Sequence, residues 1–450
     1  MANLSGGQER DQWGSKMGFI MAAAGSAVGL GNLWKFPYVA GKNGGGAFVL
    51  VYFIMLFLVG FTLMLAELVL GRKTKLNAIG AYRKISKKWK WVGGLGVITG
   101  FMILSYYSVI GGWVIKYLIE ALTGGLSVTD AAVLGDKFGT IVSSTGGSIF
   151  FHALFMIATL GIVIGGVDGG IEKASKIMMP ALFVIIILLA VRGCTLPGSM
   201  AGIKYLLVPD FSKLSMDVVL SALGQVFFSL SLGMGCMITY GSYLPDKENI
   251  PQSATIIPLL DTGVALLAGL ATLPAVFAFG FEPAGGPGLM FVTLPAVFAS
   301  MPMGTMFSIL FFVLVLFAAL SSSISLLEVC VSYVVDEFGM NRKKSTVLLG
   351  FITFLIGIPS ALSFGIWSDK TILFGKNFFD LFDFATSNVM LPLGGLLLCI
   401  FVGWVWGTDK AVDEATNNGE IAFPLAGAWS FLVKFVGPIA ISVVFIRSLI

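Results

Sequence analysis

Charge is the scarcest property of this sequence. Charged residues make up 12% of its 450 residues, about half the ~25% that is typical of soluble domains. A chain so poor in charge cannot cover a water-facing surface, which excludes a soluble enzyme, and disorder is excluded because it needs the opposite composition. The net charge of +4 is spread along the chain and predicts no nucleic-acid partner.

Residues that bind metals or carry redox chemistry are also few. The chain has one histidine, His152, and four isolated cysteines at positions 194, 236, 330 and 399, with no CxxC pair. This pattern argues against a zinc, haem or iron–sulfur site and against a disulfide scaffold. An integral-membrane enzyme is therefore the least favoured membrane class, because the sequence shows neither a nucleophile–histidine pair nor a metal cluster.

Long apolar runs dominate the chain instead. Hydrophobic residues make up 57% of it, the mean hydropathy is +0.94, and 57 glycines suit close packing of membrane helices. Nine charge-free intervals can cross a bilayer: 17–34, 43–66, 91–115, 138–167, 177–191, 218–245, 262–281, 345–368 and 384–408. With two further apolar segments, 304–336 and 423–450, the sequence predicts an all-α integral membrane protein of eleven transmembrane helices in one domain, 1–450.

The distribution of lysine and arginine predicts the orientation. The segment Gly71–Lys90 after the second helix is rich in both and has no acidic residue, so it is expected in the cytoplasm. The N-terminus then lies inside and the last helix ends outside, and the basic run Arg342–Lys344 agrees. The first 16 residues are polar and lack a signal-peptide pattern.

Two of the predicted helices are interrupted at mid-membrane depth. The first contains Gly25–Asn32, with three glycines, a serine and an asparagine, and the sixth contains Ser229–Gly235. Either stretch alone would suit close helix packing, but a matched pair in two halves is typical of the binding site of an inverted-repeat transporter. We therefore expect a 5+5 repeat, at about 14–195 and 216–408, plus an extra helix at 423–450. Freed carbonyls suit a cation and freed amides a carboxylate, as a zwitterionic amino acid with Na⁺ requires.

Ionisable and hydroxyl side chains inside the predicted spans are candidates for function. We interpret Glu67 and Glu328 as structural carboxylates that accept amides freed by the breaks, and Asp261 as a partner of a bound cation. The run Ser321–Ser323 in helix 8 offers the oxygens that a hard cation prefers.

These motifs resemble the neurotransmitter:sodium symporter family over about residues 8 to 445. The matching stretches are Gly25–Asn32, Trp34–Pro37, Asn43–Phe48, Glu67 with Gly71–Arg72, Gln225–Gly233 and Phe291–Pro295. The closest likeness is to bacterial transporters of several hydrophobic amino acids, and eleven helices rather than twelve agree with a bacterial protein of the cytoplasmic membrane. The resemblance implies two Na⁺ ions, a small-molecule substrate, the lipid bilayer as surroundings and no nucleic acid.

The resemblance also implies site residues. The first sodium site would be Ala27, Asn32, Ser229 and Asp261, completed by the substrate carboxylate; the second would be Gly25, Val28, Ala318, Ser321 and Ser322. Substrate would contact Ala27, Leu30, Gly31, Ile103, Tyr107, Phe228, Ser229, Ser231, Met234, Ser323 and Leu326. The outer gate would be Phe228 over Tyr107 with Lys35 facing Asp383, and the inner gate Arg10 with Asp336, supported by Trp13 and Tyr243. Gly170 and Pro180 match an element linked to helix 5 unwinding.

Two positions depart from the family pattern. Lys35 stands where many members have arginine and cannot make a bidentate pair, so a looser outer gate is expected. Asp261 stands where the family usually has asparagine, while Ala265 occupies a position where some bacterial members have glutamate. The chloride position would otherwise be lined by Tyr52, Gln225, Ser229 and Ala265.

The expected function is Na⁺-coupled symport of neutral hydrophobic L-amino acids, aliphatic and aromatic, into the cell by alternating access. A carboxylate at Asp261 predicts chloride independence and suggests H⁺ counter-transport by the empty carrier. The alternative is an amino-acid-gated channel or sensor on the same fold, although a channel needs a continuous lined pore.

Overall fold

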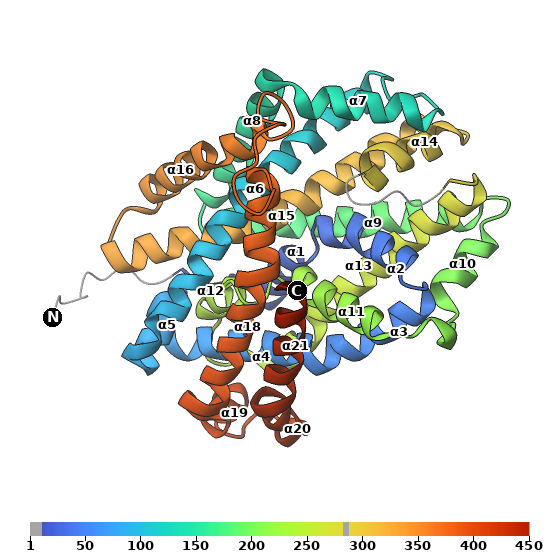
Figure 1. The fold of residues 1–450 in the computed structure, drawn as a ribbon. Coiled ribbons are helices and arrows are strands. Elements are labelled where there is room, and N and C mark those ends of the chain that lie inside the picture. Colours follow the sequence, from blue (N-terminus) through green and yellow to red (C-terminus); the bar gives the residue numbers. More distant parts are fainter. Residues whose placement is uncertain (1–10, 282–287, 450) are drawn as a thin grey trace.

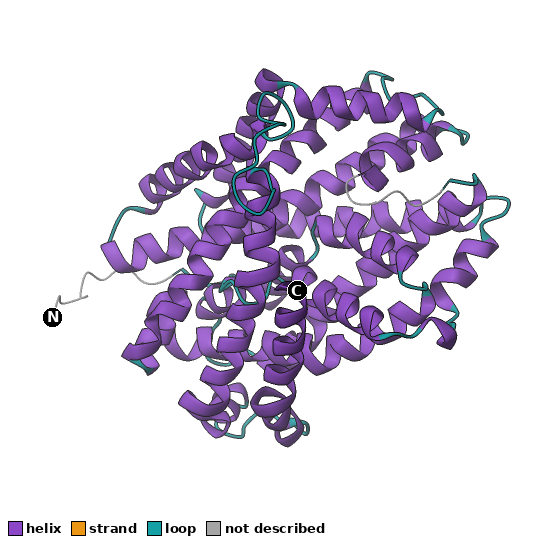
Figure 2. Cartoon of the chain, viewed as in Figure 1, coloured by secondary structure: helices purple, strands orange, loops and turns teal. Residues whose placement is uncertain are grey.

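The computed structural model describes residues 11–281 and 288–449, and in that part of the chain the named secondary structure is helical (Figures 1 and 2). Nine described helices are long and apolar enough to cross a membrane. They are Gly46–Thr74, Lys87–Leu122, Thr145–Val163, Val167–Cys194, Ile250–Ala278, Gly304–Phe338, Arg342–Leu362, Phe378–Ala415 and Ala426–Leu449.

The first helix is broken where the sequence predicts. α1 (Lys16–Ala27) and the segment Gly31–Lys42, made of η1 (Gly31–Lys35) and α2 (Phe36–Lys42), meet at an angle of 55°. Val28 is extended there (φ −70°, ψ 99°), so the backbone leaves the helix between the two pieces. This bent pair adds a tenth candidate span to the described part of the chain.

The predicted break in the second half is also present. α11 (Met216–Ser229) and α12 (Cys236–Ser242) flank a non-helical stretch at 230–235. Three residues of this stretch have positive φ: Ser231 at 54°, Gly233 at 83° and Gly235 at 79°. Glycine adopts such angles without strain. Taken as one broken span, α11 and α12 bring the described spans to eleven, as the sequence predicts.

Glu67 fastens the second break to α4 (Phe61–Thr74). Its carboxylate accepts hydrogen bonds from the amides of Gly233 (2.7 Å), Met237 (3.1 Å) and Ile238 (3.3 Å). The structural role predicted for Glu67 is therefore confirmed. Close packing supports the same junction, since a Cβ at Gly71 would lie 2.1 Å from the Ile238 carbonyl oxygen.

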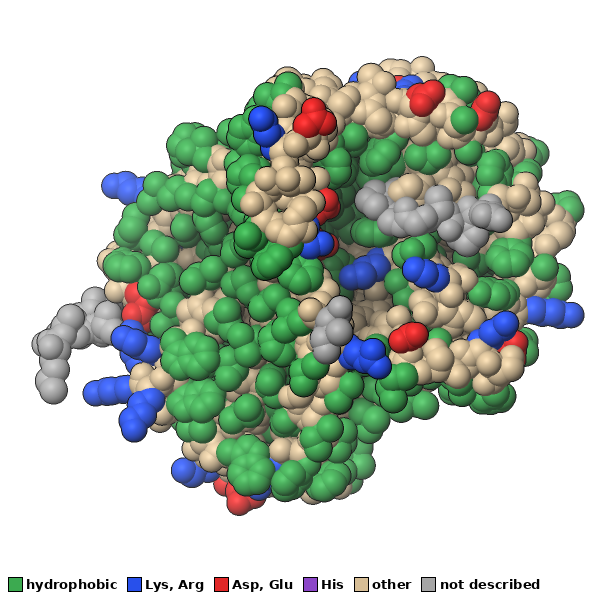
Figure 3. Space-filling model, viewed as in Figure 1, with side chains coloured by type: hydrophobic (Ala, Val, Ile, Leu, Met, Phe, Trp, Pro, Cys, Tyr) green, Lys and Arg blue, Asp and Glu red, His purple; other side chains and the backbone are tan. Residues whose placement is uncertain are grey.

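The broken helices lie in the interior of the bundle, beside long helices. α6 (Lys90–Leu122) packs against α15 (Gly304–Phe338) and α8 (Thr145–Val163), while α13 (Ile250–Ala278) packs against α9 (Lys173–Cys194) and α1 (Figure 1). Apolar side chains cover much of the visible exterior (Figure 3). These helices and their apolar exterior are those of a multi-pass membrane protein.

Candidate functional site

A cavity of about 360 Å³ lies beside the two helix breaks. It is lined by most of the residues predicted to contact substrate: Ala27, Leu30, Gly31, Ile103, Tyr107, Phe228, Ser231, Met234 and Leu326. They come from helix 1, α6, the α11–α12 region and α15. The cavity therefore combines apolar side-chain walls with the polar backbone at the break of helix 1.

The break of helix 1 presents backbone to the cavity with no room for a side chain. A Cβ at Gly29 would lie 2.6 Å from the Ser322 hydroxyl oxygen and 3.4 Å from the Tyr107 hydroxyl. A Cβ at Gly31 would lie 2.7 Å from the Phe228 ring. The Tyr107 hydroxyl is buried beside Ser322 and the Leu30 backbone, and among the described residues it makes no hydrogen bond of good geometry. Because the first amides of a helix lack internal acceptors, this wall suits a carboxylate.

Three residues predicted for the first sodium site are joined directly. The Asn32 side-chain amide donates to the Asp261 carboxylate (2.7 Å) and to the Asp261 carbonyl oxygen (3.1 Å). The Ser229 hydroxyl donates to the other carboxylate oxygen of Asp261 (2.8 Å). All three side chains are buried, and Ala27 ends α1 beside the cavity. The cluster therefore offers a hard cation one buried carboxylate and the Ser229 hydroxyl, while the Asn32 side-chain oxygen is turned to the Gly29 amide.

The second predicted sodium site joins the break of helix 1 to α15. The Ser322 hydroxyl donates to the carbonyls of Ser26 (3.2 Å) and Val28 (3.5 Å). The Ser321 hydroxyl donates to the Ala318 carbonyl (3.0 Å), and a Cβ on Gly25 would lie 3.1 Å from the Cβ of Ser321. All five predicted residues thus lie at the junction of helix 1 with α15, where their carbonyl and hydroxyl oxygens fit Na⁺.

The structure places two predicted substrate residues away from the cavity lining. The Ser323 hydroxyl bonds to Thr159 (2.8 Å) and to the Leu320 carbonyl (2.9 Å), so it faces α8, and Ser322 takes the cavity position. The Ser229 hydroxyl is directed to Asp261. Ser323 is therefore better described as a packing residue between α8 and α15, because residues next to one another on a helix point in different directions.

The outer gate residues lie around the mouth of the cavity. The Lys35 ammonium lies 3.7 Å from the centre of the Phe228 ring, a cation–π contact. Asp383 accepts hydrogen bonds from Tyr106 (3.1 Å) and Ser387 (2.9 Å). Among the described residues, Lys35 and Asp383 do not approach within ion-pair distance, although both line the cavity. The outer gate pair is thus separated.

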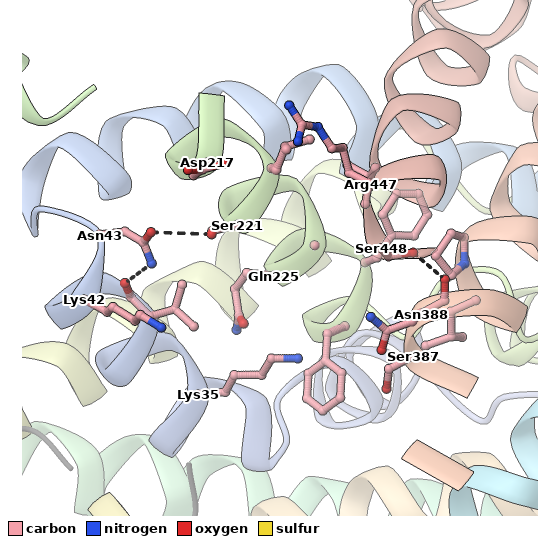
Figure 4. Close-up of a pocket in the computed structure, with 18 of the residues that line it drawn as sticks. Lys35, Lys42, Asn43, Asp217, Ser221, Gln225, Ser387, Asn388, Arg447 and Ser448 are labelled. Carbon is pink, nitrogen blue, oxygen red and sulfur yellow. Dashed lines mark hydrogen bonds between the residues drawn. The ribbon is translucent and has the colours of Figure 1, made fainter. Parts of the chain in front are cut away.

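A larger cavity of about 720 Å³ lies on the other side of Lys35 and Phe228. Figure 4 shows Lys35, Lys42, Gln225 and Arg447 around its space, with α2, α11 and the C-terminal helix α21 (Gly437–Leu449) as its walls. Both cavities share Lys35 and Phe228 in their linings. The substrate cavity therefore neighbours an open vestibule on the side predicted to be extracellular.

The predicted inner gate is packed shut. The Trp13 indole donates to the Tyr240 carbonyl (3.0 Å), and the Trp13 amide donates to the Tyr243 carbonyl (3.3 Å). The Tyr243 hydroxyl donates to Glu328 (2.6 Å). Arg10 lies outside the described residues, whereas Asp336 accepts from the backbone amide (2.9 Å) and side chain (3.1 Å) of Asn77.

Glu328 corrects one interpretation made from the sequence. In the part of the chain that the structure describes, its carboxylate does not accept amides freed by a helix break. It accepts a hydrogen bond from the Tyr243 hydroxyl and forms an ion pair with Arg342 at the start of α16 (Arg342–Leu362). A buried carboxylate needs a compensating partner, and this one is supplied across the turn after α15. The contacts on the predicted inner side are closed and the predicted outer pair is separated, as an outward-facing arrangement would require.

Sequence reasoning missed part of the cavity lining. Trp34, Tyr106 and Ile110 neighbour predicted residues along their helices, so helical spacing could have indicated them. The other missed residues lie along the segment 364–391: Phe364 follows α16, Phe379 and Asp380 lie in α17 (Phe378–Asp383) at the start of the next span, and Leu391 starts α18 (Leu391–Ile400). No local pattern signals that this segment folds over the cavity.

Comparison with known proteins agrees with this architecture. The profile described as the sodium:neurotransmitter symporter family matches residues 10–134 and 137–450. An uncharacterized sodium-dependent transporter, YhdH of Bacillus subtilis (strain 168), is 46% identical over 98% of both chains. One from Haemophilus influenzae is 40% identical over 98% of this chain and 99% of the relative.

A solved structure is similar over almost the whole chain. It is the crystal structure of MhsT in complex with L-phenylalanine, with a TM-score of 0.90 and 46% sequence identity. The match covers 98% of this chain and 100% of that chain.

Proposed function

The chain belongs to the sodium:neurotransmitter symporter family, whose members are sodium-dependent transporters rather than enzymes, and we propose that it carries neutral hydrophobic L-amino acids into the cell with Na⁺. The observation that carries this proposal is the juxtaposition of an apolar cavity with the buried cluster of Asn32, Ser229 and Asp261. Such a site accepts a zwitterion at its polar wall and a hydrocarbon side chain opposite.

The side-chain pocket supports both aliphatic and aromatic substrates. Ile103, Phe228, Met234 and Leu326 supply its apolar surface. Methionine is unbranched and adapts to different shapes, and Met234 lies between two glycines with positive φ. Similarity to a protein solved with L-phenylalanine supports the aromatic end of this range. Glutamate and lysine would bury an unpaired charge at these apolar walls and are excluded.

Two sodium ions complete the proposed site. Na⁺ at Ala27, Asn32, Ser229 and Asp261 would neutralise the buried Asp261 carboxylate and bind the substrate carboxylate. Na⁺ at Gly25, Val28, Ala318, Ser321 and Ser322 would hold helix 1 against α15. At the first site the ion would replace the hydrogen bond from the Asn32 amide nitrogen to Asp261, with the Asn32 oxygen turned toward the ion. At the second site it would replace the hydrogen bond from the Ser322 hydroxyl to the Ser26 carbonyl. Sodium binding would thereby be linked to how the broken first helix packs against its neighbours.

The proposal includes chloride independence, since Asp261 supplies the negative charge. Gln225 and Tyr52 lie near this cluster but carry no charge, and Ala265 one turn on offers no polar group. When Na⁺ leaves, the bare carboxylate would be costly in the bundle and would favour a proton. A pH-sensitive dye inside vesicles reads out the resulting H⁺ counter-transport.

Alternating access follows from the two gates. Binding would bring Phe228 over Tyr107 and Lys35 toward Asp383, after which the contacts around Trp13, Tyr243 and Asp336 would open to the cytoplasm of a bacterial cell. We place the N-terminus inside and assign the two repeats, 14–195 and 216–408, as the bodies that move against one another. Gly170, packed against Gly165, and Pro180 within α9 mark helix 5 as the element that unwinds.

A competition panel tests the substrate class. Purified protein in liposomes is offered labelled phenylalanine with each of the twenty amino acids, with Na⁺ and with K⁺ in its place. Leucine, isoleucine, valine, methionine and tryptophan should compete only in Na⁺, while glutamate and lysine should not. Strong competition by glutamate would contradict the proposed pocket.

A further inference from the structure

A basic and aromatic surface lies where α5 (Ala78–Ile85) is joined to α6. It consists of Lys87, Lys88, Trp89, Lys90 and Trp91, and it is called here the basic surface. Its three lysines are exposed and have no ion pair or side-chain hydrogen bond among the described residues. In Figure 3, Lys and Arg side chains gather beside apolar side chains on the side of the molecule where Figure 1 shows α5.

Two lysines that precede the basic surface in the sequence form ion pairs within the protein. Lys73 pairs with Glu414 (3.2 Å) and Lys75 with Asp246 (2.9 Å), and the hydrogen bond from Lys75 lowers the pKa of Asp246. The lysines of the basic surface thus remain available to an external anion. Within residues 11–281 and 288–449, no carboxylate forms an ion pair with them.

The two tryptophans indicate that this surface lies at the boundary between the membrane and water. The Trp89 and Trp91 rings are stacked, with centres 6.4 Å apart and planes at 20°. Trp91 is 54% exposed, and Trp89 packs on Phe401 at 5.5 Å. Indole rings favour the headgroup region of a bilayer, so the adjoining ammonium groups lie at the height of lipid phosphates.

We propose that the basic surface binds anionic phospholipid headgroups. Three uncompensated lysines offer charge complementarity to phosphate, and juxtamembrane lysines are attracted to anionic leaflets. The stacked indoles offer the apolar contact that separates a lipid from a free phosphate. The proposal uses the cytoplasmic orientation given under the proposed function, although the lipid chemistry itself does not depend on what is transported.

This surface is rigidly connected to the predicted inner gate. A Cβ at Gly93 would lie 2.5 Å from the Ala78 carbonyl oxygen, so the start of α6 packs directly on α5. α5 is in turn tied to the end of α15, because Asn77 donates to Asp336 and Arg83 pairs with Glu337 (2.5 Å). The hydrogen bond with Glu337 raises the pKa of Arg83. A lipid held by the basic surface therefore braces α5 against the gate residues.

Lipid retention by the detergent-purified protein tests the proposal. The protein is mixed with phosphatidylglycerol or phosphatidylcholine, and native mass spectrometry counts the lipids retained. The wild type should retain phosphatidylglycerol preferentially, and K87Q/K88Q/K90Q should weaken this binding by roughly a hundredfold, whereas K87R/K88R/K90R should keep it. Inorganic phosphate at equal concentration should not displace the lipid.

A matched control removes the same charge elsewhere. Lys173, Lys343 and Lys344 are also exposed and have no ion pair among the described residues, and they lie away from the stacked tryptophans. K173Q/K343Q/K344Q should retain phosphatidylglycerol as the wild type does. Equal retention by K87Q/K88Q/K90Q and the wild type, or an equal loss in the control, would overturn the proposal. Retention is measured without transport, so it decides the matter even if the proposed substrate class is wrong.

Discussion

The side-chain amide of Asn32 donates to the carboxylate of Asp261 across 2.7 Å, which joins the broken first helix to the middle of α13. The Asn32 side-chain oxygen accepts from the amide of Gly29 (3.0 Å), so the same residue also braces the break. A cation at this point would replace a donated hydrogen bond with a stronger charge contact. Sodium binding would therefore act on the helix that forms the substrate wall.

Removing one oxygen from either proposed sodium site should raise the Na⁺ requirement. Asn32→Ala and Ser322→Ala should each increase the Na⁺ concentration for half-maximal uptake by roughly tenfold or more, as loss of groups at a metal site commonly does. Ser332→Ala is the matched control, because its hydroxyl lies on α15 as Ser322 does and, in the described part of the chain, bonds only to the Val329 carbonyl (3.0 Å). Unchanged Na⁺ dependence in both variants would show that the sites are misassigned.

Substrate and sodium affinities should change together at the first site. The substrate carboxylate is proposed to ligate that ion, and coupling between two bound ligands is reciprocal. In the Asn32→Ala protein, equilibrium binding of labelled phenylalanine should weaken at fixed Na⁺ and recover as Na⁺ rises. Phenylalanine binding that ignores Na⁺ altogether would contradict the shared site.

Uptake by the wild type should not need chloride. Replacing chloride by gluconate on both sides of the membrane should leave uptake essentially unchanged. Asp261→Asn keeps an oxygen ligand but loses the charge, so uptake should fall and added chloride should restore part of it. A large loss for the wild type in gluconate would refute the role of Asp261, whatever the variant does.

Glu67 should matter for stability rather than for ion dependence. It accepts three backbone amides at the second break, and hydrogen bonds to a charged group contribute about 1.5–3 kcal/mol each. Glu67→Ala should lower the thermal unfolding temperature markedly in detergent, and Glu67→Gln by less. Folded protein that survives should keep the wild-type Na⁺ requirement, and normal thermal stability of Glu67→Ala would contradict this role.

The closed inner side should depend on the Tyr243 hydroxyl. Tyr243→Phe removes the donor to Glu328 (2.6 Å) while keeping the ring that packs on Trp13. A lost hydrogen bond to a charged group, about 1.5–3 kcal/mol, would favour the inward-open state roughly tenfold or more. Equilibrium binding of phenylalanine in saturating Na⁺ should weaken accordingly, whereas unchanged binding would show that this contact does not hold the gate.

Local sequence features predicted the parts of the site that depend on local structure. Both breaks were predictable because glycine-rich stretches occur at mid-membrane depth in matching helices of the two halves. Glu67 was interpretable because such breaks free backbone amides. The orientation of the neighbouring hydroxyls could not be predicted from the sequence. Ser322 and Ser323 are adjacent serines on one helix, and tertiary packing decides which of them faces the cavity. The partner of Glu328 was missed because Arg342 reaches it from the next helix. Phe364 and Phe379 were missed because tertiary packing brings the turn after α16 and the first residues of the next span to the cavity.

The most direct test of the account is whether substrate carries sodium with it. Protein in liposomes is exposed to radioactive sodium with and without unlabelled phenylalanine, and glutamate serves as the control amino acid. Phenylalanine should stimulate sodium uptake, glutamate should not, and the stimulation should be lost in the Asp261→Ala protein. Sodium entry that is independent of phenylalanine, or phenylalanine uptake with no accompanying sodium, would contradict Na⁺-coupled symport.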